Sequence, residues 1–240
     1  MPIIVRVFTA AQVMLRLFGI PYITAPMEAE AQCAALVELG LVEGIITDDS
    51  DVFLFGGARV YKNMFNQSKT VECFFLADFA RELGIDREKL VQLAYLLGSD
   101  YVEGLPGVGP VVAMELLKEF PGSDSLHQFK DWWQRVQSGR DKHEESQSNF
   151  RRRFVGPLYS VAYYWRGEFI CDVSCAQKKR FKTLYIPDDW PNPVVVRKRC
   201  WLYNCLSADD CQRDAYYHPT VDNSEEPFKW GLPDLDGLRE

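Results

Sequence analysis

Histidine is scarce in this sequence, and several short catalytic motifs are missing from it. The 240 residues include three histidines, and they contain neither a G-x-S-x-G nucleophile elbow nor a phosphate-binding P-loop. A Ser-His-Asp triad is therefore poorly supported. Long apolar runs are also lacking, since no segment reaches the roughly 20 apolar residues that a membrane-spanning helix needs. Hydrolases with a covalent nucleophile and integral membrane proteins are thus disfavoured.

Paired cysteine motifs are a second absence. The seven cysteines are scattered without a repeated C-x-x-C pair, so neither a disulfide framework nor a zinc ribbon is expected. One alternative stays open, in which the later cysteines hold a zinc ion in an interaction protein, although their spacings match no usual ligand pair. These cysteines are Cys171, Cys175, Cys200, Cys205 and Cys211.

Basic residues are not in excess, because the formal net charge is −7. This charge argues against a protein that coats nucleic acid with a uniformly basic surface. It does not argue against an enzyme acting on nucleic acid, because a carboxylate metal site carries negative charge of its own. The basic residues are concentrated in the C-terminal half, in "NFRRRF" (149–154), "KKRFK" (178–182) and "RKR" (197–199).

The first 27 residues contain Arg6 and Arg16 but no acidic residue. This composition is a feature of transit peptides. The favoured alternative is an amphipathic helix, "AAQVMLRLFG", that ends at Gly19.

Strand-like and helix-like segments alternate up to about residue 120. This alternation predicts an α/β fold with a mostly parallel sheet flanked by helices, followed by a helical and partly irregular C-terminal part. Predicted strands are 20–24 ("IPYIT") and 44–47 ("GIIT"), with a hairpin formed by 59–65 and 70–75. Predicted helices run from Pro26 to Gly40 and from the cap residue Asp86 to Gly98.

Carboxylates gather at the ends of these predicted elements. Asp49 and Asp51 follow the apolar strand "GIIT" and, two apart in an extended segment, face the same way. Glu28 and Glu30 follow the preceding strand, and Asp100 follows a helix terminator. One acidic pair alone is typical of a cap or a solvated turn, but three acidic sites at element ends favour a cation. Oxygen ligands without nearby His or Cys suit Mg²⁺ or Mn²⁺ better than zinc.

A glycine-rich turn adds a second type of site. "GLPGVGPVVAMELLKEFPG" (104–122) contains Gly107-Val108-Gly109, and Pro110 opens a helix. Glycine lets a backbone approach a ligand closely, and a helix start presents free N–H groups to a phosphate. The turn resembles a helix-hairpin-helix, which grips the DNA backbone without reading sequence.

Together these segments resemble the internal nuclease region of the flap endonuclease superfamily. The matching stretches follow one another from about Phe18 to Gly122: "APMEAEAQCAALV", "ITDDSDVFLFG", "LAYLLGSDY" and "GLPGVGPVVAMELLKEFPG". "DVFLFGGARVYKNMFN" and "EEPFKWGLPDLDGLRE" make the chain most similar to the XPG group of nucleotide-excision-repair endonucleases.

This resemblance implies a PIN-like flap-nuclease fold and a nuclear enzyme that cleaves DNA at single-strand/double-strand junctions such as flaps and bubbles. It implies two Mg²⁺ ions, replaceable by Mn²⁺, a K⁺ ion at the hairpin, and repair-complex proteins as partners. The family's catalytic and metal-binding carboxylates fall on Glu28, Glu30, Asp49, Asp51 and Asp100. Its DNA-binding hairpin falls on Gly104, Gly107, Val108, Gly109 and Pro110.

The chain also departs from the family pattern. The family's N-terminal nuclease region, which supplies two further aspartates, is not recognisable, so we expect a partial chain with an incomplete metal site. Segments 155–177 and 197–213 interrupt the family tail, and we hypothesise that they are translated introns. The expected regions are 1–103 (internal nuclease), 104–153 (hairpin and following helix) and 154–240 (irregular tail). The alternative function is a catalytically inactive fragment that binds DNA junctions.

Overall fold

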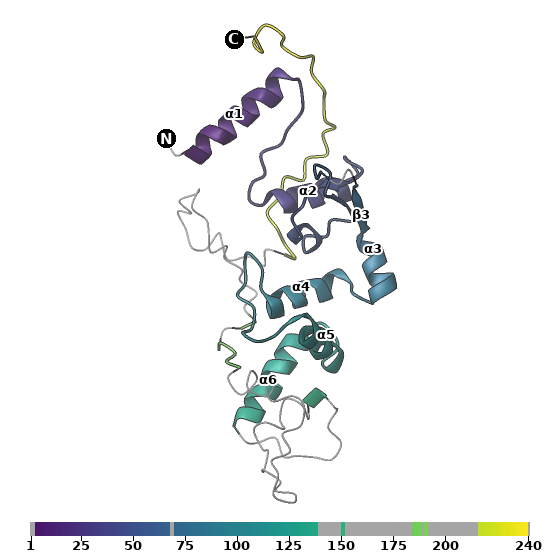
Figure 1. Ribbon diagram of the computed structural model, residues 1–240, viewed down its shortest axis with the longest axis vertical. Helices are drawn as coiled ribbons and strands as arrows, with labels where there is room; N and C mark the ends of the chain where they lie inside the picture. Colours follow the sequence, from purple (N-terminus) through teal and green to yellow (C-terminus); the bar gives the residue numbers. More distant parts are fainter. Residues whose placement is uncertain are drawn as a thin grey trace, which may run out of the picture. The chain divides into compact units, whose positions relative to one another are not determined.

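The computed structural model describes residues 3–67, 70–138, 150–151, 184–188, 190–191 and 216–239 (Figure 1). The two hypothesised insertions, 155–177 and 197–213, lie outside the described residues. The five late cysteines considered for zinc also lie outside them.

The chain forms two compact units. The first unit combines Met1–Asp78 with Pro219–Glu240, and the second is Phe79–His218. The first unit is therefore built from both ends of the chain. The predicted functional regions with boundaries at 103 and 153 stay a prediction, because functional regions and compact units are different divisions.

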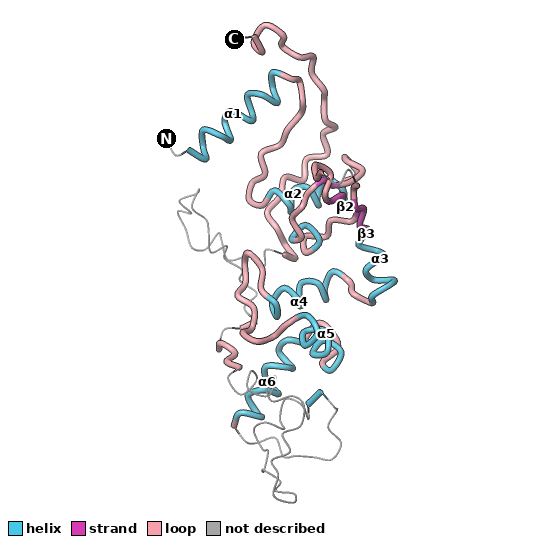
Figure 2. Tube along the Cα trace, in the orientation of Figure 1, coloured by secondary structure: helices cyan, strands magenta, loops and turns pink. Residues whose placement is uncertain are grey.

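A small mixed sheet lies in the first unit (Figure 2). Strand β1 (Ile45–Ile46) pairs in parallel with β2 (Arg59–Lys62), with Ile45 opposite Val60. Strand β3 (Glu72–Phe75) pairs antiparallel with β2, so the predicted hairpin is confirmed. The predicted α/β class is confirmed, and the described sheet holds one parallel and one antiparallel pairing.

Helix α2 (Ala29–Glu38) covers this sheet. It contacts β1 and the short 3₁₀ helix η1 (Asp51–Phe53). Ala31, Ala34, Ile45, Val52 and Val60 are buried in the first unit. Helix α1 (Ile3–Leu17) precedes α2, and α3 (Leu76–Asp78) follows β3. The small alanines of α2 allow it to lie close to the strands that lead to the acidic turn.

Two predictions for this unit need correction. Residues 20–24 form no strand, because the segment has no ladder partner among the described residues, and Ile20, Tyr22 and Ile23 are exposed. The helix predicted from Pro26 begins at Ala29, with Glu28 in an extended conformation at the cap position. Glu28 and Glu30 therefore lie at the start of a helix that follows an irregular segment.

The C-terminal segment (residues 216–239, mostly yellow in Figure 1) contributes to both units. In the first unit, the N–H of Gly231 donates to the carbonyl of Gly19 (2.8 Å), and the N–H of Asp234 donates to that of Leu17 (2.7 Å). Gly19 has φ of +68°, and a Cβ on it would lie 2.3 Å from the Gly231 carbonyl oxygen. Only glycine at position 19 permits both the turn and this close approach.

The second unit is helical. It contains the π-helical segment η2 (Phe79–Leu83), α4 (Arg87–Leu97), α5 (Pro110–Glu119) and α6 (Ser125–Gln137). Its core is aromatic, with Phe120, Phe129, Trp132 and Trp133 buried, and the indole N–H of Trp190 donates to the Tyr95 carbonyl. No helix within the described ranges is long and apolar enough to cross a membrane.

Candidate metal site and hairpin

The acidic turn after β1 is held by hydrogen bonds to its own carboxylates. The N–H of Asp49 donates to Thr47 Oγ1 (3.1 Å), and the N–H of Asp51 donates to Asp49 Oδ1 (2.9 Å). The Asp48 carboxylate accepts from the N–H of Asn63 (2.7 Å), which follows β2 with φ of +60°. The last two bonds each place an N–H donor beside a carboxylate, which offsets part of the repulsion between the clustered aspartates.

These contacts separate the three aspartates by role. Asp48 ties the end of β1 to the residue after β2, which is a structural role. Asp49 is exposed, and Asp51 is half-buried as the first residue of η1. The carboxylates of Asp49 and Asp51 are thus presented at the end of a sheet strand, where ligands of α/β proteins commonly bind.

Glu28 and Glu30 come from the first turn of α2. Glu28 is the N-cap residue, and its side chain makes no capping hydrogen bond to the helix. Both glutamates are half-buried. Both acids therefore lie at the positive end of the α2 dipole, which is a favourable place for negative charge.

Cys33 reports on the electrostatic surroundings of Glu30. Burial raises the pKa of the half-buried Cys33 thiol, and the nearby Glu30 carboxylate raises it further. Both effects act by disfavouring the negatively charged thiolate. The negative charge of Glu30 therefore acts on the Cys33 thiol, about one helical turn further along α2.

Asp100 is the candidate that belongs to the second unit. It is exposed in the loop that follows α4, whose C-cap is Gly98 with φ of +97°. The neighbouring Ser99 fixes the loop, since its hydroxyl accepts from the N–H groups of Tyr101 (3.2 Å) and Val102 (3.3 Å). The other four acids lie in the first unit.

The donor chemistry of the five acids fits a hard divalent cation, since all their ligand atoms are oxygens. Across the ranges that the structure describes, however, no three His, Cys, Asp or Glu side chains are arranged to hold a metal ion. Ligation by Glu28, Glu30, Asp49, Asp51 and Asp100 therefore stays a prediction.

The glycine-rich turn joins α4 to α5 as a helical hairpin, and the two helices contact each other. Val108 is buried, and Gly107 has φ of +88°, a conformation that favours glycine. Gly109 is the N-cap of α5, and a Cβ on it would meet no atom of the described residues within 4 Å, apart from its chain neighbours. Pro110 occupies the first turn of α5, as predicted. The open space in front of Gly109 leaves room for a phosphate at the start of α5.

Gly104 has a packing role. A Cβ on Gly104 would lie 2.2 Å from the carbonyl carbon of Leu97 and 2.4 Å from the nitrogen of Gly98. Glycine at position 104 is thus required by its contact with the end of α4. DNA contacts from Gly104, Gly107, Val108, Gly109 and Pro110 stay predictions.

Two contacts of the C-terminal segment were not expected from the sequence. The Gln32 side chain pairs with the main chain of Asp222, and the Tyr216 hydroxyl pairs with Ser99. Gln32 lies within an apolar helical stretch, and no sequence signal marks it as a partner of a residue 190 positions away. The stretch "AYYHPTVD" does contain both Tyr216 and Asp222.

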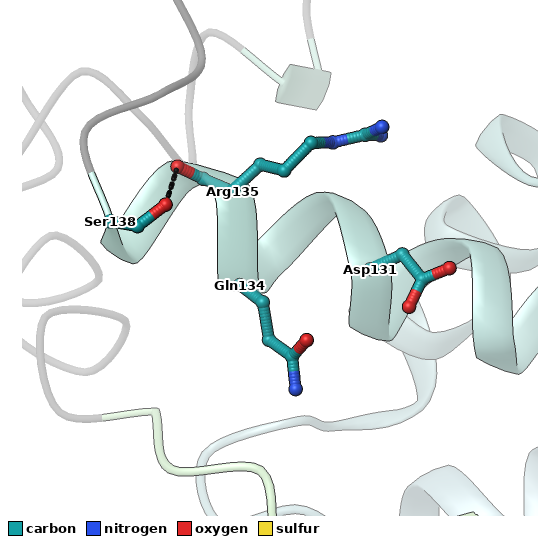
Figure 3. Close-up of a pocket in the computed structure, with 4 residues that line it drawn as sticks. All are labelled: Asp131, Gln134, Arg135 and Ser138. Atoms are coloured by element: carbon teal, nitrogen blue, oxygen red, sulfur yellow. Dashed lines mark hydrogen bonds between the residues drawn. The ribbon is translucent and has the colours of Figure 1, made fainter.

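A depression on α6 is lined by Asp131, Gln134, Arg135 and Ser138 (Figure 3). The Ser138 hydroxyl donates to the Arg135 carbonyl (3.0 Å), and the side chain of Arg135 points away from that of Gln134. These four residues lack a paired base for the serine, so the depression shows no catalytic arrangement.

Comparison with known proteins identifies the region that carries the acids. The XPG I-region matches residues 19–100, which include all five candidate carboxylates. DNA repair protein rad13 of Schizosaccharomyces pombe is 44% identical over 229 residues, covering 95% of this chain and 17% of rad13. DNA excision repair protein ERCC-5 of Mus musculus is 42% identical over 235 residues, covering 97% of this chain and 16% of ERCC-5.

A solved structure is similar as well. The catalytic core of Rad2 in complex with DNA substrate matches with a TM-score of 0.72 and 40% identity, covering 98% of this chain and 63% of that core. The chain spans less than a fifth of the length of rad13 and ERCC-5. Residues 19–100 are therefore an XPG I-region, and the chain as a whole is similar to XPG-type repair proteins and to the Rad2 catalytic core.

Proposed function

We propose that this chain is the internal nuclease and hairpin part of a structure-specific DNA endonuclease that acts in nucleotide excision repair. The observation that carries the proposal is the match of 98% of the chain to the catalytic core of Rad2, which was solved with a DNA substrate. Rad13 and ERCC-5 are named as repair proteins, which supports the same role. Its substrates are DNA junctions such as flaps and bubbles, and its compartment is the nucleus.

In this proposal Glu28, Glu30, Asp49, Asp51 and Asp100 hold two Mg²⁺ ions, for which Mn²⁺ can substitute. Two such ions supply an activated water and stabilise the leaving oxygen of a phosphodiester. The chain's own contribution is to hold the acids in position. Asp49 and Asp51 do so from the turn after β1, and Glu28 and Glu30 do so from the first turn of α2.

The hairpin has the separate task of gripping duplex DNA. The N-terminus of α5 offers main-chain N–H groups beside Gly109, where space is open. Contacts of this type position a protein on DNA without reading its sequence. K⁺ bound by main-chain carbonyls of the hairpin is part of the proposal, and repair-complex proteins are its proposed partners.

A second candidate function is a catalytically inactive module that binds DNA junctions. It is favoured by one observation, namely that the described residues include no group of three metal-ligand side chains already arranged for an ion. Such a module would use the hairpin and would not need the acids.

A cleavage and binding comparison tests both functions. The chain is incubated with flap, bubble, plain duplex and single-stranded DNA, with Mg²⁺ or with EDTA. We expect junction cleavage that requires Mg²⁺ and is strongest when the N-terminal nuclease region of a full-length relative is supplied. Junction binding that is equal in Mg²⁺ and EDTA, with no cleavage under either condition, would instead establish the inactive module.

A further inference from the structure

A buried amide on α2 is paired entirely with the C-terminal segment. Gln32 is 3% exposed and lies one turn after Glu28, to whose carbonyl its own N–H donates. Its Nε2 donates to the Asp222 carbonyl (2.9 Å), and its Oε1 accepts from the Asp222 N–H (2.7 Å). Because a buried amide must be satisfied, this two-point pairing ties α2, within the first unit, to residue 222.

A second pairing fixes the loop that carries Asp100 within the second unit. Tyr216 is fully buried, its hydroxyl is hydrogen-bonded to that of Ser99 (2.5 Å), and its ring packs edge-on against Tyr101. Arg87 of α4 donates to the Tyr216 carbonyl. The residues on either side of Asp100 are thus both in contact with Tyr216.

The direction of the Ser99–Tyr216 bond follows from the capacity of a hydroxyl group. Ser99 Oγ accepts from the N–H groups of Tyr101 and Val102, which occupies its two lone pairs. The Ser99 hydroxyl is therefore the donor, and the Tyr216 hydroxyl oxygen accepts its proton. Tyr216 therefore completes a small network that holds both amides of the Asp100 loop.

We propose that the C-terminal segment is a positioning device for the candidate acids. Through Tyr216 it orients the loop of Asp100, and through the main chain of Asp222 it orients the first turn of α2 with Glu28 and Glu30. Five residues of sequence separate Tyr216 from Asp222, so one short stretch of the C-terminal segment carries both contacts. Tyr216 and Gln32 are then positioning residues. Their effect on metal binding rests on the proposed function, whereas their contacts with the Asp100 loop and the first turn of α2 do not.

The Asp222 anchor uses only main-chain atoms, which provides a matched control. The Asp222 carboxylate accepts from the N–H of Ser224 (2.9 Å), a bond that asparagine can preserve. Asp222→Asn should therefore leave the Gln32 pairing intact. Gln32→Met keeps a similar side-chain volume and removes both hydrogen bonds.

The test measures amide hydrogen exchange in the full 240-residue chain. Tyr216→Phe should speed exchange at Tyr101 and Val102 by about two- to tenfold, the factor that corresponds to one net hydrogen bond. Gln32→Met should speed exchange at Asp222 and in the first turn of α2 by a similar factor. Ser99→Ala, which removes the acceptor itself, should speed exchange at the same two amides at least as much as Tyr216→Phe, and Ser99→Thr, which retains the hydroxyl, should keep exchange slow.

Mn²⁺ binding, followed by the electron paramagnetic resonance of the free ion, tests the link to the acids. Tyr216→Phe and Gln32→Met should weaken binding by roughly three- to tenfold, because neither can lose more than the hydrogen bonds it removes. Asp222→Asn should leave it within about twofold. Unchanged exchange in both variants would overturn the proposal, and so would faster exchange with unchanged Mn²⁺ affinity. A wild-type chain without measurable Mn²⁺ binding would contradict the proposed metal site. The exchange rates would still decide whether the C-terminal segment holds the Asp100 loop and the first turn of α2.

Discussion

Asp49 combines two tasks in one carboxylate. It accepts the N–H of Asp51, which shapes the acidic turn, and in the proposed function it also holds a cation. The two tasks need different properties of the side chain. The turn needs an acceptor oxygen, which asparagine retains, whereas the cation needs negative charge.

Substitution of Asp49 should separate these tasks. Asp49→Asn should weaken Mn²⁺ binding on the order of tenfold or more while the melting temperature without metal stays the same, because the acceptor is kept. Asp49→Ala should weaken binding similarly and lower stability by less than about 1 kcal/mol, through loss of an exposed hydrogen bond. Titration with Mn²⁺ and thermal melts provide the measurements. A large loss of stability in Asp49→Asn with unaltered Mn²⁺ binding would assign Asp49 to the turn alone.

Cys33 offers an internal probe of Glu30. The raised pKa of its thiol means that the folded chain keeps the thiol proton above the pH at which the unfolded chain loses it. The resulting stability is present below the ordinary thiol pKa of about 8.5 and is lost as the pH rises through the folded value. At pH 8, Cys33 should accordingly react with an alkylating reagent more slowly than the exposed Cys73.

The same reaction detects a bound cation. Glu30→Gln should speed alkylation of Cys33, because it removes the second cause of the raised pKa. Mn²⁺ should speed it as well in the wild-type chain, if Glu30 is a ligand, and should have no further effect in Glu30→Gln. Peptide mapping by mass spectrometry gives the rates at each cysteine, with Cys73 as the reference. A wild-type rate that ignores Mn²⁺ would remove Glu30 from the ligand set.

At the scale of elements, the helical hairpin contains two kinds of glycine: Gly107 is needed for its backbone conformation, and Gly109 faces open space. Gly107 adopts φ of +88°, whereas Gly109 has φ of −103°, which any residue can adopt. A methyl group at 109 would have no contact within 4 Å with any described residue apart from its chain neighbours. The two glycines therefore test folding and DNA approach independently.

Gly109→Ala should reduce affinity for every duplex sequence alike, because in the proposed function its methyl group would stand where a DNA phosphate approaches the N-terminus of α5. The fold should lose only about 0.5–1 kcal/mol, the usual difference between glycine and alanine at a helix cap. Gly107→Ala should instead destabilise the second unit by roughly 1–3 kcal/mol. Fluorescence anisotropy with several duplexes and thermal melts measure the two effects. Undiminished affinity in Gly109→Ala would make the turn a structural connection only.

Elements with local signals could be predicted from the sequence, and those that depend on distant partners could not. Asp86 caps α4 by accepting from the Lys89 N–H, and Gly98 ends that helix, as the residue types predict. The segment 20–24 is apolar enough for a strand, but a strand exists only if another strand pairs with it. Asp49 and Asp51 follow β1, as their sequence context predicts, whereas Glu28 and Glu30 follow no strand within the described residues. The Gln32–Asp222 pairing uses the main-chain groups of Asp222, which every residue possesses.

At the scale of the whole molecule, the two units depend differently on the C-terminal segment. The first unit includes Pro219–Glu240, and the second ends at His218. In the first unit the segment satisfies the buried amide of Gln32 and the carbonyls of Leu17 and Gly19. In the second unit it contributes Tyr216, which lies before the boundary.

A chain that stops after His218 should lose stability in the first unit alone. Leaving the Gln32 amide without its partner should cost about 1–3 kcal/mol, and hydrogen exchange in α2 should accelerate accordingly. Exchange in α4, α5 and α6 should be unchanged, because Tyr216 is retained. A chain that stops after Leu238 keeps these contacts and is the control. Equal acceleration in α4 and α2 would show that the segment supports both units as one cooperative body.

The division of the first unit between the two ends of the chain sets an order of events during synthesis on the ribosome. Helix α2 and the sheet are translated before the second unit, but the residue that satisfies Gln32 is translated only after it. At roughly 5–20 residues per second, this delay is on the order of ten seconds. The second unit can complete its folding before Pro219–Glu240, which belong to the first unit, have been translated. The nascent first unit therefore has its acidic turn formed from local contacts while the Gln32 amide is still without its partner.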